Sequence, residues 1–155
     1  MNLIVQCLLM DGAIPIVKSA CPTYSGLICN NLFSGAAENP YNFERNTGGS
    51  SGGEAGLVGA NCIPFGIGSD HAGSLRVPSA FCKVTTICPS LDKLGLGGAN
   101  RGLYTKRGKN AESCLVLTLG PMCKTVDDCI AVMESWFAPE RLNFLPHIAK
   151  IPVTS

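Results

Sequence analysis

The clustering of glycine constrains this chain more than any other feature. Nine of its eighteen glycines lie between Thr47 and Ser74. Glycine adopts backbone conformations that other residues avoid, and it lets other parts of the chain approach closely. We therefore expect the backbone to be tightly specified here, in one loop around Ser50 and a second loop that leads to Ser74.

The segment between these loops predicts a helix and then a strand. Residues 52–61 combine small side chains with an apolar spacing, and Ser50 or Ser51 can cap the start of such a helix. Residues 64–69 (PFGIGS) predict a short buried strand, and residues 70–76 form the loop that leaves it.

Other elements are predicted on both sides of this region. Residues 1–10 indicate the end of a helix, which Gly12 can cap, and residues 13–19 (AIPIVKS) indicate a buried strand. Residues 21–47 are polar and irregular, which predicts a loop or short helical turns around a turn at 39–42. Strands and helices that alternate in this way favour an α/β domain with a mostly buried sheet.

The last third of the chain begins with a predicted strand at 115–119 and continues with the best helix pattern, at 125–137. Thr125 can cap this helix together with Asp128, three residues later. A single apolar stripe is expected to face the core: Val126, Cys129, Ile130, Met133 and Phe137. Trp136 is also expected to be a core residue.

Composition narrows the possible classes of protein. The chain has 155 residues, enough for one domain with a core, and only 15% of them are charged against about 25% in ordinary soluble domains. A net charge of +1 provides no field that would attract nucleic acid, so no nucleic-acid partner is expected.

The cysteines and apolar runs bear on metal sites and location. Nine cysteines occur without a C-x-x-C pair, and there are only two histidines, which argues against structural zinc and favours free thiols in a reducing compartment. The sequence predicts no signal peptide, and it contains no apolar run of about 20 residues. We expect an intracellular protein, either cytoplasmic or associated with a membrane surface, without a transmembrane segment.

The first glycine-rich loop, residues 48–54 (GGSSGGE), has three interpretations. Composition alone suggests a flexible linker. The pattern Gly48-x-Ser50-x-Gly52 also matches the nucleophile elbow of α/β-hydrolases, but that elbow follows a strand, and its histidine would have to be His147 or His71. A loop that opens a helix of small residues can instead present backbone N–H groups to a developing negative charge.

The run at residues 66–78, which contains the second loop, fits neither nucleotide motif, because its third glycine comes too late for G-x-G-x-x-G and no G-K-[ST] follows. Ser74 ends a tight turn after a strand, where consecutive backbone N–H groups can converge beside its hydroxyl as an oxyanion hole. The alternative is a structural turn in which Asp70 acts as the cap and Ser74 is only exposed.

Taken together, the two loops resemble the amidase signature family. The resemblance rests on GGSSGGE, PFGIGSD and the run from Gly73 to Cys82 (GSLRVPSAFC), and it is strongest over residues 47–82. Similar flanks are found at 39–41 (NPY) and at 119–122 (LGPM). Within the family the likeness is to animal fatty acid amide hydrolases.

This resemblance implies an α/β fold with a mixed β-sheet covered by helices on both faces. It also implies a Ser-Ser-Lys mechanism, with Ser74 as the acylated nucleophile and Ser50, after a cis peptide bond, as the proton relay. The backbone N–H groups of His71, Ala72, Gly73 and Ser74 would bind the oxyanion. No metal or cofactor is implied.

The sequence departs from the family pattern at three places. The family's lysine base lies upstream of the matched segment, and Lys18, the only lysine before Ser50, falls in the strand region after that position. Ala72 stands where the family usually has glycine, which would strain the loop if a positive φ were needed. Residues 83–91 (KVTTICPSL) replace the expected G-x-K-P-T-like stretch.

We therefore expect residues 1–155 to form a single partial amidase domain, with its signature core at 47–82 and with the lysine segment and the C-terminal part missing. The expected activity is hydrolysis of linear, fatty acid type amides through an acyl-enzyme. The alternative is a catalytically inactive remnant with a binding function or none. Small lipophilic amides are the expected partners, with peripheral membrane association or a dimer as further expectations.

Overall fold

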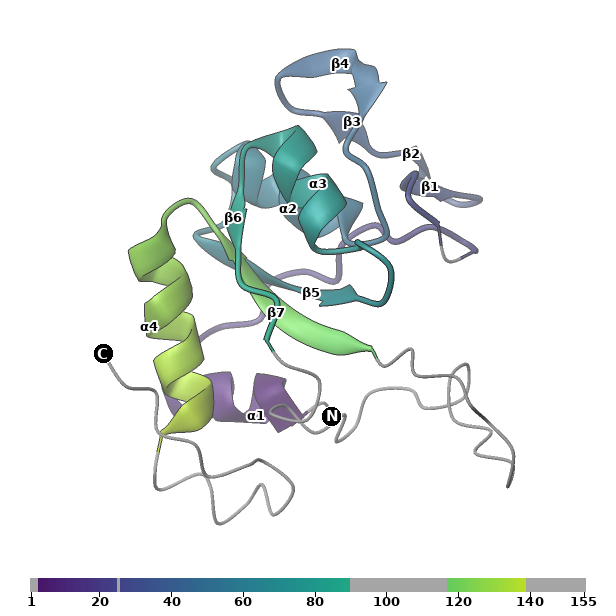
Figure 1. The fold of residues 1–155 in the computed structure, drawn as a ribbon. Helices are drawn as coiled ribbons and strands as arrows, with labels where there is room; N and C mark the ends of the chain where they lie inside the picture. The colour runs from purple at the N-terminus through teal and green to yellow at the C-terminus, as the bar shows by residue number, and fades with distance from the viewer. Residues whose placement is uncertain (1–2, 25, 90–116, 139–155) are drawn as a thin grey trace, which may run out of the picture.

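A three-stranded sheet lies at the centre of the computed structural model, which describes residues 3–24, 26–89 and 117–138 (Figure 1). Its strand order is β5 (Phe65–Asp70), β7 (Thr118–Cys123) and β6 (Thr85–Thr86). Both pairings are antiparallel, and Gly68 of β5 lies opposite Gly120 of β7. The α/β class is confirmed, as is the strand expected at 64–69.

Helices cover both faces of this sheet (Figure 1). On one side lie α2 (Gly52–Gly59) and α3 (Arg76–Cys82), and on the other lie α1 (Leu3–Met10) and α4 (Val126–Phe137). Each pair of helices closes its own apolar cluster against the strands. The expected arrangement of helices on both faces is therefore present in the described residues.

Successive residues of β5 point to opposite faces of the sheet, and Gly68 lies on the face that α2 covers. Ile67 packs on the cluster of α1 and α4, while a Cβ at Gly68 would lie 2.7 Å from Ser51 Oγ and 2.6 Å from a methyl carbon of Leu75. Any side chain at Gly68 would force these neighbours apart. The start of α2 can therefore lie directly on the strand, and this contact positions the first glycine-rich loop.

The strand expected at residues 13–19 is not formed, and this prediction was wrong. Ile14 and Ile16 are 81% and 69% exposed, and no described strand pairs with the segment. Its end is held by α2 instead, because Gly53 N–H donates to Ala20 O at 3.1 Å. Pro15 removes a backbone donor that a central strand would need.

Two small hairpins replace the expected loop at residues 21–47. The first pairs β1 (Asn30–Asn31) with β2 (Gly35–Ala36), and the second pairs β3 (Glu38–Asn39) with β4 (Asn42–Asn46). The prediction of an irregular segment was therefore wrong for these residues, although the turn expected at 39–42 joins β3 to β4. Their strands are short and polar, so the apolar pattern of a strand is absent.

The capping box predicted for α4 is confirmed, whereas its buried face was partly wrong. Thr125 Oγ1 accepts the Asp128 N–H at 3.1 Å, and the Asp128 carboxylate accepts the Thr125 N–H. Val126 and Ile130 are 58% and 43% exposed. Cys129, Val132 and Trp136 of α4 are buried. Met133 and Phe137 are half-buried and pack against the same cluster, so the prediction was wrong for Val126 and Ile130 and missed Val132.

Two further elements were not expected from the sequence. Helix α3 begins at the last residue of the predicted loop and continues over residues for which no element was predicted. Strand β6 pairs with the C-terminal end of β7. Strand β7 also continues past the predicted end at residue 119 to Cys123. Residues 115 and 116 of the predicted strand lie outside the described residues, as does the segment from 139 onward.

No helix in the described part of the chain is long and apolar enough to cross a membrane.

The revised face of α4 predicts different costs for two valines. Val132→Ala should lower the free energy of unfolding by about 2 kcal/mol, because it empties a site in the core. The matched change Val126→Ala, at an exposed position, should lower it by less than about 0.5 kcal/mol. Urea denaturation of both variants measures the difference, and equal losses would contradict the assigned face.

Candidate active site

The first glycine-rich loop connects β4 to α2. Its Gly49–Ser50 peptide bond is cis, as the resemblance implied. Ser51 is the N-cap residue of α2, but its side chain does not bond to the helix. The Ser51 hydroxyl instead accepts the Ser69 N–H at 3.0 Å and donates to Ser69 O at 3.2 Å. This residue therefore fastens the start of α2 to the end of β5.

The second loop leaves β5 and meets the first one. Ser51 N–H donates to Ser74 O at 3.2 Å, so the residue next to Ser50 is bonded to the backbone of Ser74. Both Ser50 and Ser74 are half-buried. The structure thus brings together the two loops that carry the candidate nucleophile and the candidate relay.

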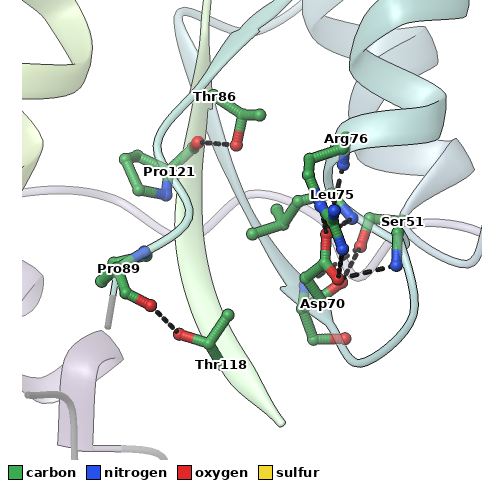
Figure 2. A network of polar contacts seen from close by, with 10 residues as sticks. Ser51, Asp70, Leu75, Arg76, Thr86, Pro89, Thr118 and Pro121 are labelled. Atoms are coloured by element: carbon green, nitrogen blue, oxygen red, sulfur yellow. Dashed lines mark hydrogen bonds and ion pairs between the residues drawn. The ribbon is translucent and has the colours of Figure 1, made fainter. Parts of the chain in front are cut away.

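Asp70, the last residue of β5, organises the second loop (Figure 2). Its Oδ1 accepts from Gly73 N–H at 2.7 Å and from Arg76 Nη2 at 3.0 Å. Its Oδ2 accepts from Leu75 N–H at 3.1 Å and from Arg76 Nε at 3.0 Å. Only 3% of Asp70 is exposed, so these bonds take the place of water around the carboxylate.

These contacts decide the charge of Asp70. Burial alone would raise the pKa of its carboxyl group, but the hydrogen bonds from Arg76 and from the N–H groups of Gly73 and Leu75 outweigh burial and lower the pKa to about 2. Asp70 is therefore a carboxylate at neutral pH. The interpretation of Asp70 as a loop cap is confirmed, and it is compatible with a catalytic role for the loop.

The expected oxyanion donors need one correction. The N–H of Gly73 already donates to Asp70, so it does not face an incoming oxyanion as expected. Gly73 has the positive φ of the loop, at +117°, whereas Ala72 is not among the residues with positive φ. The alanine at position 72 therefore causes no strain there. His71, Ala72 and Ser74 remain as candidate donors.

None of the three lysines in the described residues lies at the two serines. Lys18 is exposed, and its charge lies close to the Cys21 thiol. Lys124 donates to Gly59 O at 2.7 Å, and Lys83 lies 4.8 Å from the centroid of the Tyr41 ring. The described part of the chain therefore supplies no lysine base.

The nucleophile-elbow interpretation of Ser50 is not favoured. The strand before Ser50, β4, is an exposed hairpin strand and does not belong to the central sheet. His147 lies outside the described residues. A flexible linker is not favoured either, because residues 48–53 are mostly buried against α3 and against the segments at 19–20 and 26–29.

Two polar residues at this site were missed by sequence reasoning. Glu54, in the first turn of α2, accepts a hydrogen bond from Ser19 Oγ at 2.9 Å, and burial raises the pKa of its carboxyl group. Asn46 Oδ1 accepts from Gly48 N–H, at the start of the first loop, and from Cys29 N–H, in the segment that packs against this loop. The Asn-x-Gly spacing at 46–48 could have indicated this turn.

Among the described residues, no group of three or more His, Cys, Asp or Glu side chains could hold a metal ion.

The amidase family profile matches residues 2–144. The chain belongs to the amidase family. Among curated relatives, it is 36% identical over 155 residues to the vitamin D3 hydroxylase-associated protein of Gallus gallus, covering 97% of this chain and 32% of that protein. It is 30% identical over 150 residues to fatty-acid amide hydrolase 1 of Sus scrofa, covering 96% of this chain and 25% of that protein.

Solved structures agree with this assignment. A fatty acid amide hydrolase matches with a TM-score of 0.85 and 27% identity, over 99% of this chain and 26% of its own. A bacterial aryl acylamidase of the amidase signature family matches with a TM-score of 0.73 and 26% identity, over 86% of this chain and 26% of its own. The chain therefore has the amidase signature fold and spans about a quarter to a third of the length of these relatives.

The low pKa of Asp70 predicts a loss of stability in acid. Because the folded value of about 2 lies below the ordinary value of 3.8, this stabilisation is fully present above about pH 4 and is lost as the pH falls through about 2. Between pH 6 and pH 2 the native chain should lose about 2 kcal/mol more of unfolding free energy than Asp70→Asn. Urea denaturation at several pH values in this range measures the unfolding free energy of both proteins. If that free energy falls equally with pH in both, the prediction is contradicted.

Proposed function

We propose that this chain carries the two-serine core of an amidase that cleaves linear, lipophilic amides through an acyl-enzyme on Ser74. The observation that supports this proposal most is the 3.2 Å hydrogen bond from Ser51 N–H to Ser74 O, because it holds the Ser50 and Ser74 loops side by side. Membership of the amidase family supports the same class of reaction, cleavage of a C–N bond.

In this proposal the hydroxyl oxygen of Ser74 attacks the amide carbon, and its proton passes to Ser50. The N–H groups of Ala72 and Ser74, with that of His71, stabilise the oxyanion that forms. Ser50 then returns a proton to the departing amine, and water releases the acyl group from Ser74. A lysine acts as the final base in the Ser-Ser-Lys mechanism, and it would have to come from outside the described residues.

A lipophilic substrate is supported by one feature of the site. Leu27 is 50% exposed, and its side chain lies 4.0 Å from the position of a Cβ at Gly73. An apolar side chain therefore lies beside the loop of the proposed nucleophile. The similarity to a relative named as a fatty-acid amide hydrolase points the same way. Association with a membrane surface or as a dimer is compatible with the exposed apolar side chains of Ile14, Ile28 and Phe33.

A second candidate is a chain that binds amides without turning them over. It is favoured by the positions of Lys18, Lys83 and Lys124, none of which contacts either serine. In that case the two loops would provide a binding surface, and Ser74 would lack an activated hydroxyl.

Labelling with a lipophilic fluorophosphonate, followed by intact-mass spectrometry, tests the first proposal. The native chain should gain one label, and Ser74→Ala should gain none. Ser50→Ala should react about 100-fold more slowly, because a lost acid–base relay typically costs that much. Ser135→Ala, on α4 across the sheet, is the matched control and should react at the native rate. A folded native chain that stays unlabelled would refute catalysis and favour binding alone.

A further inference from the structure

Asn46 is the last residue of β4, and its side-chain amide makes three hydrogen bonds just before the first loop. Its Oδ1 accepts from Gly48 N–H at 2.8 Å and from Cys29 N–H at 3.0 Å. Its Nδ2 donates to Cys29 O at 3.0 Å. Two donors face the amide oxygen and one acceptor faces the nitrogen, so these partners fix the orientation of the side chain.

The bond to Gly48 shapes the entry to the Ser50 loop. A side-chain oxygen that accepts the N–H two residues later forms an Asx turn, which offers the backbone an alternative to continuing a strand. Gly48 has a φ of +75° in this turn, and Ser50 follows two residues later. The Asn46 side chain therefore sets the direction in which the chain reaches Ser50.

The bonds to Cys29 fix the segment at 26–29, against which the same loop packs. A Cβ at Gly49 would lie 3.2 Å from Cys29 N and 2.6 Å from Gly26 O, and a Cβ at Gly52 would lie 3.0 Å from Cys29 Sγ. Residues on both sides of Ser50 thus contact the segment at 26–29. Since the Asn46 side chain bonds to both Cys29 and Gly48, it joins the loop to the segment at 26–29 that supports it.

We propose that Asn46 is a positioning residue for Ser50, holding the relay serine in register with Ser74. This inference rests on the proposed amidase function. Removing the amide would leave the neighbouring backbone bonds in place, from Ala37 N–H to Cys29 O at 2.8 Å and from Thr47 N–H to Ala37 O at 3.0 Å. The loss should therefore be confined to the Ser50 loop.

The test compares Asn46→Ala and Asn46→Asp with a matched control, Asn31→Ala. Asn31, in β1, also donates to a backbone carbonyl, Cys21 O at 2.8 Å, and accepts from Phe33 N–H at 2.8 Å, but neither bond is to the Ser50 loop. Hydrogen–deuterium exchange of the peptide that covers residues 47–52 should accelerate about 10-fold in Asn46→Ala and stay at the native rate in Asn31→Ala.

Fluorophosphonate labelling of the full chain provides the second measurement. In Asn46→Ala the maximal rate of labelling should fall about 10- to 100-fold, with the half-saturating probe concentration within about twofold of native, because misplacing a reacting group slows the reaction without weakening binding. Asn46→Asp keeps the acceptor for Gly48 and Cys29 but loses the donor to Cys29 O. Its maximal rate of labelling should therefore lie between that of the native chain and that of Asn46→Ala.

The two measurements separate the two proposals. Native exchange in Asn46→Ala, or equal acceleration in Asn31→Ala, would overturn the role of Asn46 whatever the chain catalyses. Faster exchange with an unchanged labelling rate would overturn it as well. A native chain that takes no label would instead refute the proposed function, and the exchange rates alone would then decide whether Asn46 holds the loop.

Discussion

The carboxylate of Asp70 receives hydrogen bonds from Gly73, Leu75 and Arg76, and the second loop depends on these bonds. They close the turn after β5 and fix the start of α3, so the carbonyl of Ser74 is held where Ser51 N–H can reach it. Because the carboxylate is buried, each of these donors replaces water that it has lost. A neutral or misplaced side chain at this position would release the loop that carries the proposed nucleophile.

Close packing between α2 and the sheet then places the first loop beside the second. Gly68 leaves room for the Ser51 hydroxyl on β5, and Gly52 leaves room for Cys29 on the other side of the loop. Ser51 is bonded to Ser69 and to Ser74, and Asn46 is bonded to Gly48. Ser50, the proposed relay, is therefore held between two fixed segments of the loop, and such preorganisation is what a proton relay requires.

Much of this arrangement was predictable from local sequence. The glycine pattern predicted both loops, α2 and β5, and Thr125 with Asp128 predicted the start of α4. The apolar run at 13–19 was misleading, because hydrophobicity indicates burial only where a partner is present. The predicted length of β7 was too short. Pro121 lacks the N–H of an ordinary strand residue, but the Pro121 carbonyl still accepts from Thr86 Oγ1 at 2.7 Å (Figure 2). The bonds of Asn46 to Cys29 join residues far apart in sequence, which no periodicity can reveal.

The central claim is that Ser50 and Ser74 form one reaction centre. A crystal structure of the chain after reaction with a fluorophosphonate tests it most directly. The account predicts a phosphonate on Ser74 Oγ, with the Ser50 hydroxyl within hydrogen-bond reach of the Ser74 oxygen, at about 2.6–3.2 Å. A phosphonate on another residue, or a Ser50 hydroxyl turned away from Ser74, would contradict it.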